Sequence, residues 1–172
     1  MSIINYLLPS LLALIVTGST WAAEEALVTN SNVAPLTRFL EEQPLHKDAP
    51  VVRAALLQWE EPSKDVVDVV CPGIFKPIPD KSIKYSGELL AQFIFGSAAY
   101  QLENPSEKGK LMPSQLAGMQ SMLKAYRSFL AQDSQARIPR LDQLSQDETN
   151  GKLPEVLAPL VAANCKSSAS EP

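Results

Sequence analysis

The sequence predicts an all-α fold, in which about five helices form a compact single-domain bundle with a long proline-rich loop and one disulfide. The chain has 172 residues, 45% hydrophobic and 20% charged, a globular composition that is large enough for one core. Apolar residues recur at intervals of three and four over much of residues 35–165, which is the spacing of a helix face. The β-branched run at residues 66–70 is too short to form a sheet alone.

The N-terminal segment has the features of an export signal. The first 23 residues contain no charged side chain, and residues 7–16 are mostly apolar. An apolar run of about ten residues has the length of a signal-peptide core, whereas a bilayer span needs about 20. Small residues then flank Trp21, and we expect cleavage after Ala22 or Ala23. The protein would then be periplasmic or secreted, with no stable membrane insertion after cleavage.

The predicted organisation follows from this signal. We expect a signal peptide at residues 1–22, a flexible leader at 23–34, a helical domain at 35–165 and a disordered tail at 166–172. Two alternatives remain for the first segment: an uncleaved anchor helix kinked at Pro9, or a buried internal helix.

The two cysteines, Cys71 and Cys165, are 94 positions apart. In an oxidising compartment two such thiols are expected to join. Closing a loop of this length stabilises a fold by about 4–5 kcal/mol in the chain-entropy model. A metal site would need more His or Cys than the single His present, and no Cys-x-x-Cys redox motif occurs. We therefore predict a structural disulfide and no metal or cofactor.

The first two predicted helices are short. Residues 35–44 place three apolar side chains on one face, and the helix ends at Pro44; these side chains are Leu36, Phe39 and Leu40. Asp48 is a suitable N-cap for a second helix, which ends before Pro62 and carries a stripe of Val52, Leu56 and Trp59.

Residues 63–85 are predicted to be an extended loop held at Cys71. Prolines exclude regular structure after the cysteine; they are Pro72, Pro77 and Pro79. The valine run before the cysteine has an alternative interpretation as a strand that pairs with a partner protein. Three apolar residues of the loop either cap the core or form a contact surface for a protein partner: Ile74, Phe75 and Ile78.

Residues 86–104 predict the central helix. Only Gln92 and Ser97 are clearly polar between Leu89 and Tyr100, and a helix that is apolar nearly all round is buried on several sides. The small residues 96–99 would let another backbone approach closely.

The rest of the domain is predicted to be helical as well. A long helix from Pro113 to about Gln132 has an apolar stripe of Met112, Leu116, Met119, Leu123, Tyr126 and Leu130. Its polar positions are expected to face away from the core: Ser114, Ser121, Lys124 and Ser128. After Pro139 we expect one or two helical turns. A last helix starts at Pro154 and ends at Cys165, with an apolar face of Val156, Leu157, Leu160 and Val161.

Composition and motifs favour a binding role over catalysis. The net charge of −4 and the lack of a basic block make nucleic acid an unsuitable partner. No G-x-S-x-G or glycine-rich phosphate loop occurs, so we assign no catalytic or cofactor-binding residue. A hydrolase would require at least two of the following groups to converge: His46, Asp65, Asp68 and a tyrosine (Tyr85, Tyr100 or Tyr126). We therefore expect a non-catalytic protein that binds a protein partner; an envelope structural or accessory protein and a hydrolase are the alternatives.

The second half of the chain also resembles a known family. Its segments "YSGELLAQFIFGSAAY", "SQLAGMQSMLKAYRSFLAQDSQARIP" and "LPEVLAPLVAANC" are similar in order to the Tai/Rap-type periplasmic immunity proteins. Those small helical proteins protect bacteria against cell-wall amidases delivered by type VI secretion. The matching positions are Gly96, Tyr100, Gln115, Tyr126, Arg137 and Cys165. The resemblance implies inhibition by blocking the active-site cleft of an effector, and it transfers no inhibitory residue to this chain.

Overall fold

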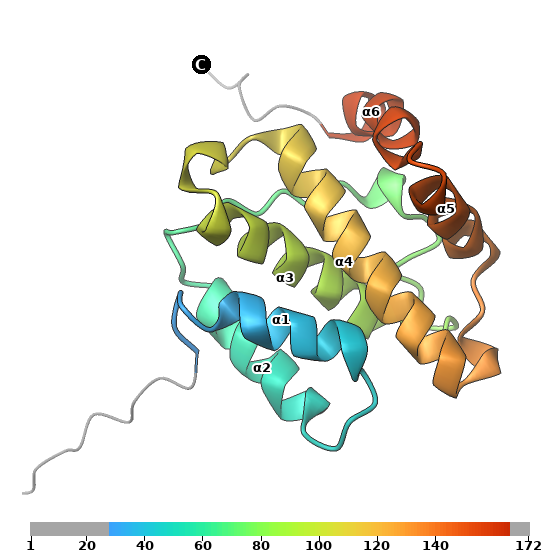
Figure 1. Cartoon of the computed structure of the whole chain (residues 1–172), viewed down its shortest axis with the longest axis horizontal. Helices are drawn as coiled ribbons and strands as arrows, with labels where there is room; N and C mark the ends of the chain where they lie inside the picture. The colour runs from blue at the N-terminus through green and yellow to red at the C-terminus, as the bar shows by residue number, and fades with distance from the viewer. Residues whose placement is uncertain (1–27, 166–172) are drawn as a thin grey trace, which may run out of the picture.

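The computed structural model describes residues 28–165, which form six α-helices and three short 3-10 helices, with no strand in this range (Figure 1). The α-helices are α1 (Val33–Glu42), α2 (Ala49–Glu60), α3 (Ser86–Glu103), α4 (Leu111–Gln132), α5 (Pro139–Thr149) and α6 (Leu153–Asn164). The 3-10 helices are η1 (Pro72–Ile74), η2 (Pro105–Glu107) and η3 (Ser134–Ala136). The predicted all-α class is confirmed. The predicted signal peptide, its cleavage site and the C-terminal tail lie outside the described residues.

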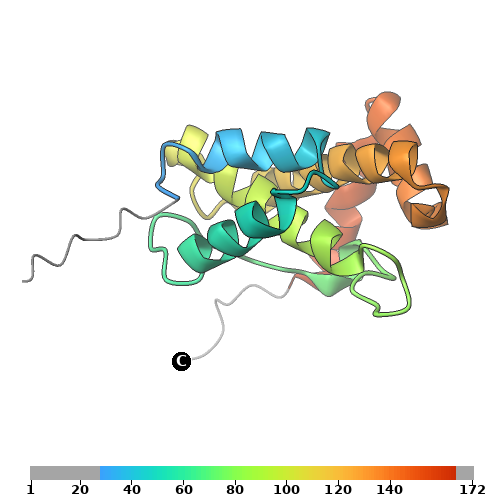
Figure 2. The same ribbon diagram turned by 90° about the horizontal axis from the view of Figure 1, so that it is seen from below.

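Helix α3 is central, as its sequence predicts. It contacts α1, α2 and α4, and its faces enter two separate apolar clusters. Leu89 and Phe93 belong to the larger cluster, with α4, α5, α6 and the loop before α3. Ala91, Phe95 and Ala99 belong to the smaller cluster, with α1 and α2. Figure 2 shows α1 and α4 along one face of the molecule, and α2 with the loop after it along the opposite face.

The crossing of α3 and α4 depends on small residues. A Cβ atom added at Gly96 would lie 2.2 Å from the Cβ of Ser121 and 3.1 Å from the carbonyl oxygen of Ala117. A Cβ atom added at Gly118 would lie 2.7 Å from the carbonyl oxygen of Phe93. The two helices are therefore close enough for backbone contact, and the glycine in the 96–99 run has the role that the sequence predicts.

The disulfide between Cys71 and Cys165 is confirmed, with an S–S distance of 2.00 Å and a Cα–Cα distance of 5.1 Å. It joins the start of η1 to the end of α6, which also pack against each other. The last helix is thereby fixed to the loop that precedes the central helix.

The proline-rich loop closes the larger apolar cluster. Ile74, Phe75 and Ile78 are 1%, 0% and 2% exposed. The rings of Phe75 and Phe93 pack with their centroids 5.0 Å apart. Of the two roles that the sequence left open for these side chains, their burial agrees with a cap on the core and not with a contact surface for a partner. The disulfide and α6 hold this loop against the bundle, where burial of large apolar side chains is favourable.

Other boundaries differ from the sequence prediction. Helix α1 begins at Val33, and Val28 is buried in the smaller cluster, so the packed domain starts before residue 35. The expected turns after Pro139 form a complete helix, α5.

Ser114 and Ser121 are buried rather than facing solvent, since they are 4% and 3% exposed. No helix within residues 28–165 combines the length and the apolar character that a bilayer span requires.

Candidate functional site

A groove follows α4 on the face of the molecule that also carries α1. Its middle is a hollow of about 160 Å³ with walls from α1, α3 and α4. A hollow of about 480 Å³ extends it toward the end of α4, and one of about 250 Å³ extends it toward the start of α4. Adjacent hollows share lining residues, so we describe them together as the α4 groove. Its principal lining side chains are Arg38, Glu41, Tyr100, Gln120, Lys124 and Arg127.

Small residues keep the middle of the α4 groove open. Ala34, Gly96, Ala99 and Ala117 line this hollow and place little side-chain volume between the helices. Long polar and charged side chains stand around them. The groove therefore combines a floor of small residues with a charged rim, and rigid helices hold both.

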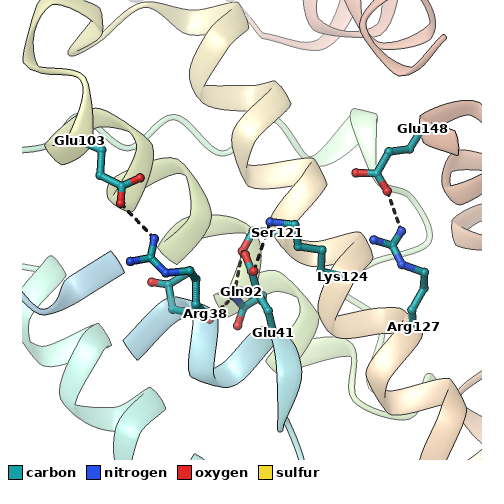
Figure 3. Close-up of polar contacts among 9 residues, drawn as sticks. Arg38, Glu41, Gln92, Glu103, Ser121, Lys124, Arg127 and Glu148 are labelled. Atoms are coloured by element: carbon teal, nitrogen blue, oxygen red, sulfur yellow. Dashed lines mark hydrogen bonds and ion pairs between the residues drawn. The ribbon is translucent and has the colours of Figure 1, made fainter. Parts of the chain in front are cut away.

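A buried polar cluster lies beneath the rim (Figure 3). Ser121 donates a hydrogen bond to Oε1 of Glu41 at 2.6 Å, and Lys124 Nζ lies 3.3 Å from Oε2 of the same carboxylate. Gln92 donates to Ser121 Oγ at 2.8 Å and to the carbonyl oxygen of Thr37 at 3.2 Å. Glu41, Ser121 and Gln92 are at most 8% exposed. Because they come from α1, α4 and α3, their contacts join three helices.

Two more ion pairs lie at the sides of this cluster (Figure 3). Arg38 on α1 contacts Glu103 at the end of α3, with 3.0 Å between Nη1 and Oε1. Arg127 on α4 contacts Glu148 on α5, with 2.6 Å between Nη1 and Oε2. These arginine side chains are 54% and 46% exposed, so each pair contributes only about 0–1 kcal/mol to stability. They remain accessible to a partner.

The hydroxyl–carboxylate pair in the cluster is arranged as a clamp. The Ser121 hydroxyl uses its proton on Glu41 and accepts a hydrogen bond from Gln92, so its donor is already engaged. The other oxygen of the Glu41 carboxylate contacts Lys124 rather than a histidine. Charge-assisted hydrogen bonds of this kind are among the stronger ones in proteins, and here they fix α1 to α4 across α3.

A second polar cluster lies at the start of α3. Tyr85 has a left-handed backbone (φ 61°), stacks on Phe129 with centroids 4.3 Å apart, and donates to Oδ2 of Asp133 at 2.8 Å. Lys84 Nζ lies 2.5 Å from the same oxygen. The hydrogen bond from Lys84, followed by that from Tyr85, lowers the pKa of Asp133. The same contacts with Asp133 raise the pKa of Lys84 and of Tyr85. The lysine therefore stays charged and the phenol stays protonated, which suits a structural clasp between η3 and α3.

The catalytic candidates from the sequence are held in separate contacts. His46 Nδ1 lies 3.6 Å from Asp48, and the His46 ring packs against Phe39. Asp65 accepts a hydrogen bond from Asn30, and Asp68 is exposed. Among the described residues, no recorded contact joins two of the candidates. No cluster of His, Cys, Asp and Glu in this part of the chain could hold a metal ion.

The candidate tyrosines also have other partners. Tyr126 donates to Asp142 at 2.7 Å and accepts from the backbone N–H of Ile138 at 3.0 Å, which ties α4 to the start of α5. Tyr85 belongs to the clasp, and the half-buried Tyr100 lines the α4 groove.

Sequence reasoning missed the α4 groove and most of the charged residues on it. Glu41 and Ser121 look like ordinary surface positions, because each is polar and lies outside an apolar stripe. Gln92 could have indicated the buried polar cluster, since it is one of two clearly polar residues in the most apolar part of α3. A polar side chain in such a position needs a buried partner.

Comparison with family models, with curated proteins and with solved structures finds no match to this chain.

Proposed function

We propose that this protein is exported to the periplasm or secreted and acts by binding a protein partner through the α4 groove. An inhibitor or immunity protein is the specific role that we infer. The groove is the observation that carries the proposal, because it presents charges of both signs on three helices that are clamped together.

The form of the groove favours a protein over a small molecule. Small-molecule sites are mostly enclosed and apolar, with a few polar groups that fix orientation. The α4 groove is open along its length, and Arg38, Lys124 and Arg127 are exposed on its rim. Its other end is apolar, with Met112, Leu116 and Pro154. A loop or helix of a partner could place apolar residues at that end and charged residues along the rim.

Two observations support export. The first 23 residues are uncharged and contain an apolar run of signal-peptide length. The two cysteines of the chain form a disulfide, and such bonds persist mainly in oxidising compartments.

The resemblance to Tai/Rap-type immunity proteins supports the inhibitory role. Of its matching positions, Gly96 lies at the α3–α4 crossing, Tyr126 joins α4 to α5, and Cys165 is in the disulfide. These positions determine packing, so the resemblance concerns the scaffold more than the binding surface. On this proposal the partner is a secreted cell-wall amidase.

Site-specific photo-cross-linking tests the proposal. A benzophenone amino acid replaces Gln120, which lines the groove, or Gln58, which is exposed on α2 on the opposite face. After irradiation of living cells, we expect the Gln120 probe to form an adduct with one protein, identified by mass spectrometry, and the Gln58 probe to form none.

The double variant Arg38→Ala/Arg127→Ala supplies the specificity control. It should remove most of the adduct while leaving the fold intact, because both ion pairs are at the surface. Lys81→Ala, an exposed lysine outside the groove, should leave the adduct unchanged. An adduct that forms equally at both probe positions would contradict the groove as the binding site. If the captured partner is an amidase whose activity this protein does not reduce, the accessory-protein alternative is favoured instead.

A further inference from the structure

A second surface lies on the face opposite the α4 groove, in the segment between α2 and η1 (Figure 2). Residues 66–70, which we call the edge segment, contain no helix, and residues 67–71 contain neither a turn nor a bend. Two buried glutamines bind its backbone. Gln101 accepts from the N–H of Val67 at 3.0 Å and donates to the carbonyl of Val67 at 3.1 Å. Gln115 donates to the carbonyl of Val69 at 2.5 Å.

This contact pattern has the period of a β-strand. In an extended chain the peptide groups of alternate residues point to opposite edges. The glutamines bind Val67 and Val69 from the side of α3 and α4, so they take the place of a neighbouring strand on that edge. The backbone groups of Val66, Asp68 and Val70 belong to the other edge. Within residues 28–165 these backbone groups make no recorded hydrogen bond.

The side chains of the edge segment leave that edge accessible. Val67 and Val70 are 43% and 39% exposed, and Asp68 is exposed as well. Natural proteins usually protect such an edge with lysine, proline or a bulge, and residues 66–70 contain no lysine or proline. Two exposed valines beside an unpaired edge form a template for strand addition.

We propose that residues 66–70 accept an extended segment of another protein, which adds as an antiparallel β-strand and carries a basic residue at every third position among β-branched ones. The valines select the apolar residues of that segment. Asp65 and Asp68 select its basic residues, because opposite charges on facing strands attract. This surface is separate from the α4 groove, so either proposal can fail without the other.

A second copy of this chain is a poorer occupant than a basic strand. In an antiparallel pair of two edge segments, only one register uses Val66, Asp68 and Val70 together. That register places the two Asp68 carboxylates directly opposite each other, which is destabilising.

A peptide-binding experiment tests the proposal. The probe is a fluorescein-labelled peptide, acetyl-Val-Val-Lys-Val-Val-Lys-amide, added to the purified oxidised protein. Matched control peptides carry N-methyl groups on one or the other set of alternate amides, which keeps the side chains and removes backbone donors. We expect the unmodified peptide to raise fluorescence anisotropy, and at least one methylated peptide to bind about five-fold or more weakly.

Hydrogen exchange places the peptide on the protein. We expect the amides of Asp68 and Val70 to exchange at least about ten-fold more slowly with peptide bound, while the amide of Val67, already bonded to Gln101, changes little. Asp68→Lys should weaken binding of the basic peptide about five-fold, whereas Glu61→Lys, on an exposed residue at the end of α2, should not.

Three results would overturn the proposal. One is equal binding of the unmodified peptide and both methylated peptides. Another is unchanged exchange at Asp68 and Val70 when peptide binds. The third is slow exchange of these amides before peptide is added, which would mean that the edge is already hydrogen-bonded. Light scattering then identifies the partner: a dimer indicates a second copy of the chain, and a monomer indicates another part of the same chain.

Discussion

At the scale of single residues, Glu41 is the group that most directly connects stability to the α4 groove. Glu41 is 8% exposed, and its carboxylate contacts both Ser121 and Lys124. We expect Glu41→Ala to lower the free energy of unfolding by about 1–3 kcal/mol, because it leaves a buried hydroxyl without its partner. Urea denaturation measures the change. Glu42→Ala, at the exposed next position, should change stability by less than about 0.5 kcal/mol; equal effects of the two variants would refute the clamp.

Tyr126 predicts a specific dependence of stability on alkaline pH. Burial is the main cause that raises the pKa of its hydroxyl from 10.0 to about 12, and the hydrogen bond to Asp142 adds to the increase. The folded state therefore holds this proton more tightly than the unfolded state does. The resulting stabilisation is complete below pH 10 and is lost as the pH rises through about 12.

Comparison with Tyr126→Phe isolates this effect. The difference in unfolding free energy between the wild-type protein and the variant should change between pH 10 and 12 in the direction that weakens the wild type. A difference that stays constant over this range would show that Tyr126 does not titrate with a raised pKa. Urea denaturation at a series of pH values provides the measurement.

Residue-level prediction from sequence succeeded where the residue type alone determines the chemistry and failed where burial depends on a neighbouring helix. The pairing of Cys71 with Cys165 followed from the count of cysteines and the expected compartment. Ser121 was placed on the solvent side because the stripe of α4 faces elsewhere. It is buried because α3 crosses α4 at Ser121 and α1 packs beside the crossing, and no spacing within α4 contains that information.

At the scale of elements, the α3–α4 crossing yields a matched pair of glycine substitutions. We expect Gly96→Ala to lower the free energy of unfolding by about 1–3 kcal/mol, because the new methyl group would overlap Ser121 and displace a well-packed helix. Gly87→Ala is the control in the first turn of the same helix, where an added Cβ meets nothing within 4 Å. It should be neutral or stabilise by up to about 1 kcal/mol. Thermal denaturation of both variants checks the crossing, and equal stabilities would contradict it.

The predicted elements with broad apolar faces were the ones located most accurately. α3 begins at Ser86, as its sequence predicts, and α6 ends at Asn164, one residue before the predicted end at Cys165. α5 was underestimated because its fully buried residues are only Leu141 and Leu144 in a mostly polar segment. α4 begins at Leu111, since Pro113 is tolerated within the first turn and need not be the first residue. The proline-rich loop was harder, because irregular backbone has no period from which burial can be read.

At the scale of the whole molecule, the disulfide is the strongest single constraint between distant parts of the chain. It spans 94 positions and joins the loop before α3 to the end of α6. We expect Cys71→Ser/Cys165→Ser to lower the free energy of unfolding by about 2–5 kcal/mol. Dithiothreitol should lower the melting temperature of the wild-type protein and leave that of the double variant unchanged. Identical melting temperatures with and without reductant would contradict a stabilising role.

The global arrangement explains why the sequence could identify the fold class but not the binding surface. Apolar stripes determine which residues are buried, and they predicted an all-α bundle. The α4 groove exists because α1 and α4 lie on the same face of α3, with small residues between them. That relation involves three helices at once, so no single stretch of sequence contains it. The apolar residues of the proline-rich loop were considered as a binding surface because they stand out within one short segment.

The central claim is that this chain crosses a membrane to a compartment where its disulfide forms and its partner is bound. Intact-mass spectrometry of the protein from fractionated cells, with alkylation before and after reduction, tests this claim most directly. The account predicts a periplasmic or secreted chain that begins at Ala23 or Glu24 and is alkylated at two thiols only after reduction. A cytosolic chain that retains Met1 and is alkylated at both cysteines without reduction would contradict it.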